Sequence, residues 1–247
     1  MTYCCGILVR DGLVMVADTR TNAGLDNIST FRKLHAFEAP GERVMLLASA
    51  GNLSLGQSVL SVLQEGLENP ETSEVERLAD APTLFQGAER IGRAVRHVRS
   101  EHAAALEECG LQFDVSFLFG GQTVGESPRL FMVYAAGNFI ECTVDTPYLQ
   151  IGEHKYGKPI LDRAVSHQVD LYDALKIGLI SMDSTMRSNL AVGLPIDVAV
   201  LRRDALELEL MYRIEPNEPY FNDLRERWSE ALRAAYVAIP RPPYVGS

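Results

Sequence analysis

The sequence is poor in cysteine and has no cysteine pattern that would build a site. Its four cysteines, Cys4, Cys5, Cys109 and Cys142, include no C-x-x-C pair, so neither a zinc site nor a thioredoxin-like redox motif is indicated. Cys4 and Cys5 are adjacent, so on a strand they would point to opposite faces. We expect four buried, reduced thiols, and we expect neither a metal nor a cofactor.

Long apolar runs and an excess of positive charge are also lacking. No window of the 247 residues approaches the length that spans a bilayer, and Met1 to Val9 lack the basic start of a signal peptide. We therefore expect a cytoplasmic protein with no membrane partner. The chain has 23 Lys and Arg against 33 Asp and Glu, a formal net charge of −10. This balance argues against nucleic acid as a partner, because neutralising phosphates needs clustered basic residues.

Hydrophobic residues make up 47% of the chain, enough for one sizeable core. Alternating or apolar runs between turn residues predict strands at Tyr3–Arg10, Leu13–Asp18, Phe31–Phe37, Arg43–Ser49, Phe113–Phe119, Arg129–Ala135, Phe139–Val144, Ile196–Arg202 and Leu206–Arg213. Helical spacing predicts helices at Leu53–Gly66, Leu84–Glu108, Tyr156–Ser166, Leu171–Asn189 and Phe221–Tyr236. Gly120-Gly121 is expected to form a turn. Because strands come in blocks with helix pairs between them, we expect an α+β fold, a four-layer αββα sandwich of two antiparallel sheets flanked by helices.

Thr2 follows the initiator Met1 directly. Removal of Met1 is favoured by a small second residue and would leave Thr2 with a free α-amine, whose ordinary pKa is near ~8. That amine can act as the base for the hydroxyl of the same residue, which is the N-terminal-threonine form of nucleophilic catalysis. A β-branched side chain also restricts the position of the hydroxyl.

Two charged residues accompany Thr2 in the expected sheet. Asp18 ends the strand that pairs with the one after Thr2, and Lys33 follows 15 residues later on the next β-like segment. A lysine held by Asp18 beside the Thr2 hydroxyl would lower the pKa of that hydroxyl and assist proton transfer.

Several segments resemble the proteasome β-subunit superfamily of N-terminal-nucleophile hydrolases. They are Thr2, Gly6-Ile7, Ala17-Asp18-Thr19-Arg20, Lys33-Leu34 and Ala48-Ser49-Ala50-Gly51. Within the superfamily the sequence looks closest to the bacterial ancestral β-subunit family, Anbu. The segments that carry this likeness are 150–161, 181–190 and the extension past Arg213. The resemblance covers most of the chain and agrees with the expected order of elements.

The resemblance implies a threonine peptidase or amidase that acts on a peptide or protein through an acyl-enzyme. Thr2 would be the nucleophile, Asp18 and Lys33 the pair that tunes it, and the backbone N–H of Ala48 the donor to the oxyanion. Asp183 would be a supporting carboxylate close to the Thr2 amine. The family also implies a homo-oligomeric ring or spiral, with an unfoldase partner left undefined.

The sequence departs from the family pattern at its supporting serines. Glu153 stands where the family has one serine, and it could accept a hydrogen bond in that serine's place. Met186 stands where the second is usual, and Ser184 or Thr185 could replace it. Two other functions stay open: an N-terminal-nucleophile enzyme for small amides, and a proteasome-like scaffold with a weak or decayed site.

The domain boundary is expected after Arg213. Residues 1–213 would form the hydrolase domain, and residues 214–247 would form a helix and a Pro-rich tail. This extension would pack on the domain or on a neighbouring subunit.

Overall fold

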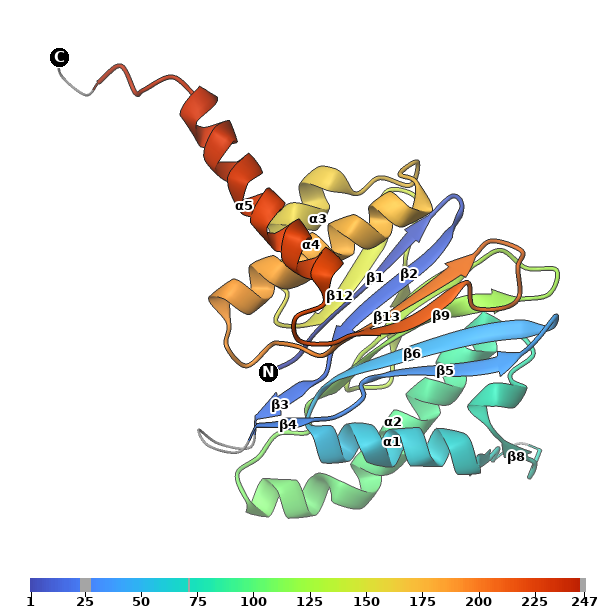
Figure 1. The fold of residues 1–247 in the computed structure, drawn as a ribbon. Helices are drawn as coiled ribbons and strands as arrows, with labels where there is room; N and C mark the ends of the chain where they lie inside the picture. Colours follow the sequence, from blue (N-terminus) through green and yellow to red (C-terminus); the bar gives the residue numbers. More distant parts are fainter. Residues whose placement is uncertain (23–27, 71, 245–247) are drawn as a thin grey trace.

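The computed structural model describes residues 1–22, 28–70 and 72–244, and within them the fold is mixed α+β with two five-stranded antiparallel sheets (Figure 1). The first sheet runs in the order β12 (Tyr148–Gly152), β1 (Tyr3–Val9), β2 (Gly12–Asp18), β13 (Ile196–Arg202) and β14 (Leu210–Ile214). The second runs β11 (Phe139–Glu141), β10 (Arg129–Val133), β9 (Val115–Thr123), β6 (Arg43–Gly51) and β5 (Leu34–Ala39). Two-stranded ribbons pair β3 (Arg20–Asn22) with β4 (Ile28–Thr30) and β7 (Leu67–Glu68) with β8 (Val75–Glu76).

Three apolar clusters hold the layers together. Cys4 and Met15 of the first sheet pack with Leu118 of the second, so the sheets meet face to face. On the outer face of the first sheet, Cys5 packs with residues of α4 (Leu171–Ser188). The adjacent cysteines therefore point to opposite faces, as predicted.

Helices cover the outer face of each sheet (Figure 1). The first sheet is covered by α4, by α3 (Lys158–Ala164) and by the start of α5 (Pro219–Ala238). The second is covered by α1 (Leu53–Glu65) and α2 (Leu84–Glu108), with the short helix η1 (Leu78–Asp80) beside them. Strands β1 and β2 are buried on both sides, which explains why they read as almost continuous apolar runs.

Several expectations were wrong or incomplete. Gly120-Gly121 is not a turn: both residues lie inside β9 and pair with Leu46 and Met45 of β6. A Cβ at Gly121 would come within 2.0 Å of the Val44 carbonyl oxygen, so glycine serves close strand packing there. Strand β12 and the ribbons β3–β4 and β7–β8 were not predicted from the sequence.

The cysteine expectation fails at one position, since Cys109 is exposed while the other three are buried. Cys109 is the C-cap of α2, and Gly110 follows with φ +67°, which is the usual place for glycine at a helix end. Among the described residues, no helix is both long enough and apolar enough to cross a membrane.

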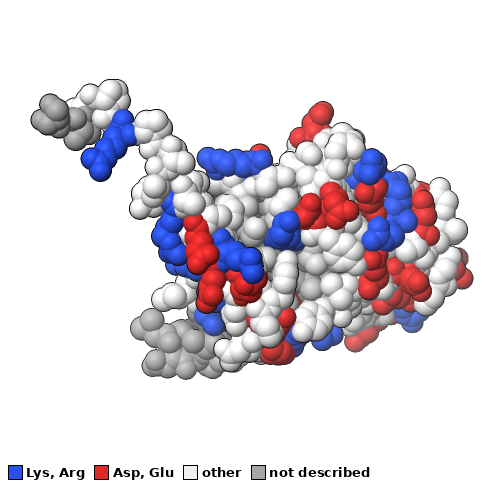
Figure 2. All heavy atoms as spheres, turned by 45° about the horizontal axis from the view of Figure 1, so that its top comes forward, with Lys and Arg blue, Asp and Glu red and all other residues white. Residues whose placement is uncertain are grey.

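Helix α5 leaves the body of the molecule after its first turns (Figure 1). Phe221 and Leu224 are buried, and the Arg225 guanidinium binds the Asp183 carboxylate at 2.6 Å. Farther on, Leu232, Tyr236 and other apolar residues are exposed. Basic and acidic side chains are interspersed over the face seen in Figure 2, from which the extension projects. The end of the predicted tail, residues 245–247, lies outside the described residues.

Candidate active site

Thr2 stands immediately before β1, at a cleft of about 400 Å³. The residues that line this cleft are Met1, Thr2, Thr21, Lys33, Ser49, Ala50, Gly51, Asn52 and Leu53. Thr2 is only 8% exposed, while Met1 is 66% exposed. The backbone on either side of Thr2 is held by hydrogen bonds from Glu153 N–H to the Thr2 carbonyl (2.7 Å) and from Tyr3 N–H to Asp18 (3.1 Å). The position of Thr2 is thus fixed by both neighbours of β1, strands β12 and β2.

Asp18 and Lys33 form a buried ion pair beside this position. Lys33 Nζ lies 2.8 Å from Asp18 Oδ1 and also donates to the Arg20 carbonyl at 2.7 Å. Asp18 is fully buried and accepts further hydrogen bonds from the backbone N–H groups of Tyr3 and Gly193. The pair that the sequence predicted is therefore in contact, and Lys33 lines the same cleft as Thr2.

The electrostatics of the pair follow from its burial. Burial raises the pKa of the Asp18 carboxyl, while Lys33 and the two backbone donors oppose this rise. The nearby Cys4 thiol also has a pKa raised well above its usual value, first by burial and then by the Asp18 carboxylate. Cys4 is consequently protonated at neutral pH and does not compete with a hydroxyl as nucleophile.

The structure does not bring Ala48 to the cleft. Ala48 is buried between the sheets, where it pairs with Leu34 of β5 and Leu118 of β9. The wall beside Thr2 is instead made by the end of β6, from Ser49 to Gly51.

A backbone donor nevertheless points toward this cleft from β6. Ser49 N–H donates to the Lys33 carbonyl (3.1 Å) at the edge that faces β5. Because alternate N–H groups of a strand point to the same edge, Gly51 N–H points there too. Strand β5 begins at Leu34, so it does not extend to face Gly51. A Cβ at Gly51 would lie 2.5 Å from the Asp114 carbonyl oxygen, and its φ is +104°. Glycine is therefore needed at this position.

Glu153 lies close to Thr2, as its backbone hydrogen bond requires. Glu153 is only 8% exposed, and its carboxylate accepts a hydrogen bond from Asn189 Nδ2 at 3.1 Å. Gly152 precedes it with φ +79°, and a Cβ there would approach the Thr2 carbonyl oxygen to 2.0 Å. Sequence reasoning missed Asn189, because it lies 36 residues away and only the fold brings it to Glu153.

Asp183 and Ser184 have other partners. The Asp183 carboxylate is fully buried and bound by Arg187 at 3.0 Å and Arg225 at 2.6 Å, so it joins α4 to α5. The Ser184 hydroxyl donates to the Ile180 carbonyl one turn earlier on α4 (2.9 Å). Met186 packs against the apolar cluster under α4. None of the three lines the cleft at Thr2.

Thr21 adds a polar atom that sequence reasoning also missed. Its hydroxyl oxygen is buried and has no hydrogen-bond partner among the described residues, and Thr21 lines the same cleft as the end of β6. Such an orphaned group is a natural place for a water or ligand atom. No group of three or more His, Cys, Asp or Glu residues that could hold a metal is found within residues 1–22, 28–70 and 72–244.

Comparison with known proteins gives a consistent picture from solved structures. A scan of protein-family models finds no match, and neither does a search of curated proteins. Among solved structures, a Gly-1 mutant of Anbu from Hyphomicrobium sp. strain MC1 is 46% identical, with 98% of this chain and 99% of that chain covered and a TM-score of 0.89. Anbu, the ancestral β-subunit, from Yersinia bercovieri is 45% identical, with 98% and 99% covered and a TM-score of 0.89. A helical assembly of the Anbu complex from Pseudomonas aeruginosa contains a chain 41% identical, with 99% and 100% covered and a TM-score of 0.90.

Proposed function

Because the chain belongs to the Anbu family of proteasome-like ancestral β-subunits, we propose that it is a threonine peptidase or amidase whose nucleophile is Thr2. The observation that carries the proposal is the buried Asp18–Lys33 pair at the cleft that Thr2 lines. A buried ion pair costs desolvation energy and gives little net stability, so its place beside the cleft favours a functional role, and an ammonium there can stabilise a nearby alkoxide. The four-layer αββα sandwich of N-terminal-nucleophile hydrolases is the architecture that we assign to the sheets and helices.

The proposed reaction begins with removal of Met1, which frees the α-amine of Thr2. The amine takes the proton of the Thr2 hydroxyl, and the oxygen attacks the amide carbonyl of the substrate. The C–N bond then breaks, and the leaving amine takes a proton, which leaves an acyl ester on Thr2. Water attacks this ester with the amine as base and restores the free hydroxyl.

Each neighbouring group has a proposed part in this reaction. Lys33, held by Asp18, lowers the pKa of the Thr2 hydroxyl. The Gly51 N–H, in place of the expected Ala48 N–H, donates to the oxyanion of the tetrahedral intermediate. Glu153, positioned by Asn189, accepts a hydrogen bond from the freed amine. Asp183 acts at a distance by fixing α4 and α5, and Ser184 has no direct part.

We also propose that the protein works as a homo-oligomeric ring or spiral. A relative forms a helical assembly, and the projecting part of α5 exposes Leu232, Tyr236 and Val237. Exposed apolar residues on a protruding helix are typical of a surface that packs on a neighbour. Residues 214–247 would then be an extension of the hydrolase domain that completes its assembly.

The test compares unstructured peptides with a panel of small amides, using protein from which Met1 has been removed. We expect peptide turnover by the wild-type chain and none by Thr2→Ala, with the size of the assembly unchanged by light scattering. Thr2→Ser serves as the matched control, since it keeps a hydroxyl and an amine and should retain activity. Turnover of small amides alone would support the small-amide enzyme. Unchanged turnover in Thr2→Ala would refute Thr2 as nucleophile, and no turnover of any amide would favour the scaffold.

A further inference from the structure

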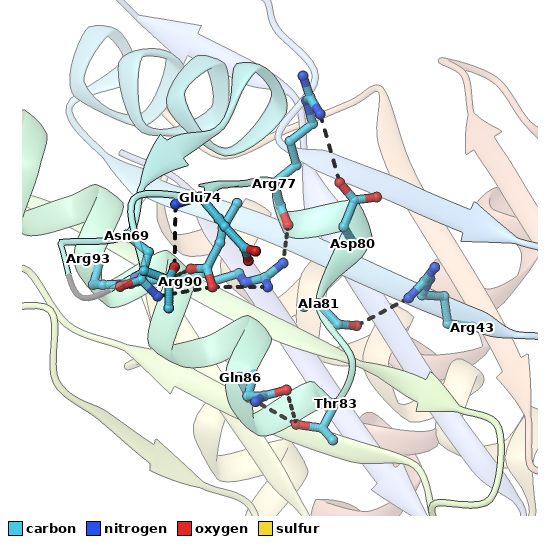
Figure 3. A network of polar contacts seen from close by, with 12 residues as sticks. Arg43, Asn69, Glu74, Arg77, Asp80, Ala81, Thr83, Gln86, Arg90 and Arg93 are labelled. Atoms are coloured by element: carbon cyan, nitrogen blue, oxygen red, sulfur yellow. Dashed lines mark hydrogen bonds and ion pairs between the residues drawn. The ribbon is translucent and has the colours of Figure 1, made fainter.

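A second hollow lies on the helical layer below the second sheet and shares no lining residue with the cleft at Thr2. Its volume is about 410 Å³, within the range of pockets that hold small molecules. Its polar lining comes from α2 and the β7–β8 ribbon (Figure 3). We call it the arginine hollow, and its main residues are Asn69, Glu76, Gln86, Arg90, Arg93 and Arg96.

The arginines follow one another at intervals of three along α2. Residues at this spacing lie near one another on a helix surface, so the three guanidinium groups are presented together. Glu76 and Glu89 are the carboxylates in the lining, which leaves an excess of one positive charge. This local excess stands in a chain whose formal net charge is −10.

The Glu76 carboxylate is an oxyanion that the donors of the hollow already bind. Its carboxylate accepts from Asn69 Nδ2 at 3.1 Å, lies 3.5 Å from Arg90 and is also bound by Arg93. The Arg93 hydrogen bond is the main reason that the pKa of Glu76 lies below its usual value. Donors from a helix and a ribbon therefore already converge on one carboxylate in this hollow.

Much of the donor capacity remains unused after Glu76 is satisfied. A guanidinium carries five N–H donors. Within the described chain, Arg96 uses its guanidinium only for the Gly137 carbonyl, at 2.9 Å, and has no carboxylate partner. Among the described residues, the Gln86 side chain has one hydrogen bond, which its Oε1 accepts from the Thr83 hydroxyl at 3.5 Å, so its Nε2 donors are not used. Arg96, Gln86 and the free side of Arg93 thus offer donors to a ligand in the hollow.

We propose that the arginine hollow binds a small phosphate-bearing anion. Phosphate groups match the planar fork of guanidinium groups and take several N–H donors at once. A small anion also offsets the excess of one positive charge in the lining, which a neutral ligand of the same size would leave uncompensated. The hollow is separate from the cleft at Thr2, so this proposal does not depend on Thr2 being a nucleophile.

Titration calorimetry with inorganic phosphate in metal-free buffer tests the proposal on the assembled protein. We expect one saturable site per chain, weakened at least about tenfold by Arg96→Gln, which removes charge-assisted hydrogen bonds. The matched control is Arg99→Gln, which removes the same charge from the same helix. Arg99 is three residues after Arg96 and does not line the hollow, because its guanidinium lies over the Phe113 ring. Arg99→Gln should bind like the wild type.

Two further variants keep the test decisive if one substitution disturbs folding. Arg93→Gln should weaken binding in the same way, and Arg96→Lys should retain part of it. Absence of saturable binding by the folded wild-type protein would overturn the proposal. Equal weakening by Arg96→Gln and Arg99→Gln would also overturn it, because binding would then reflect general charge and not the hollow.

Discussion

Replacing Lys33 with methionine tests the buried ion pair at the heart of the site. The change deletes the ammonium that lies 2.8 Å from Asp18 and 2.7 Å from the Arg20 carbonyl, and it leaves the Asp18 carboxylate buried without a counter-charge. Breaking a buried pair from one side costs about 3–5 kcal/mol. Asp18 keeps the N–H donors of Tyr3 and Gly193. We therefore expect the free energy of unfolding to fall by about 3 kcal/mol at pH 7, near the lower end of this range.

The loss should depend on pH in a direction that the structure fixes. Burial already raises the pKa of Asp18 in the folded chain, and removing Lys33 raises it further. A carboxyl whose folded pKa exceeds its unfolded value takes up a proton more readily in the folded state. Its destabilising effect is therefore full above the folded pKa and fades as pH falls toward the unfolded value, near ~3.9. The gap between the variant and the wild type should shrink from pH 7 to pH 5.

Urea unfolding at equal protein concentration measures this gap, with Lys158→Met as the control. Lys158 is half exposed and pairs with Asp162 one turn away on the same helix, so its loss should cost only about 0.3–0.5 kcal/mol. A loss below about 1 kcal/mol for Lys33→Met, a threshold well under the buried-pair cost, would refute the reasoning. A loss that does not change with pH would refute the assignment of the charge to Asp18.

Three further results are expected. In the native protein a thiol reagent should modify Cys109 alone, because the other three thiols are buried. All four should react in guanidinium, and fast reaction of a second thiol in the native protein would contradict this prediction. Gly152→Ala should abolish peptide turnover, since its Cβ would displace the Thr2 carbonyl, and unchanged turnover would show that the placement of Thr2 is wrong. Leu232→Glu with Tyr236→Glu should shift the assembly toward single chains in light scattering, and an unchanged size would exclude this part of α5 from the interface.

The sequence was informative where a local pattern decides the structure. Helix α2 and strand β13 have the bounds that periodicity predicts, because each has a clear apolar pattern between distinct ends. Strand β12 escaped notice because Tyr148–Gly152 is short and stands at the edge of its sheet. The glycines of β9 suggested a turn because their role is close contact with β6, which no local pattern reveals.

The site shows the same division. The contact between Asp18 and Lys33 could be expected, since each residue has a defined place at the end or start of a strand. The donor from β6 could not be predicted. Ala48 is paired on both sides, with Leu34 of β5 and Leu118 of β9, whereas Gly51 lies beyond the start of β5 and lines the cleft. No local pattern shows where β5 begins. The sequence did contain one signal, a glycine directly before Asn52, the N-cap of α1. The contact of Asn189 with Glu153 could not be predicted either, because only the tertiary structure brings the two residues together.

The most direct test of the central claim is the intact mass of the protein before and after treatment with a peptide epoxyketone. This electrophile reacts with both the hydroxyl and the free amine of an N-terminal threonine. We predict a starting mass that lacks Met1, one adduct per chain, and no adduct on Thr2→Ala. A chain that has lost Met1 but takes no adduct, or an adduct that persists in Thr2→Ala, would contradict the assignment of Thr2 as the nucleophile.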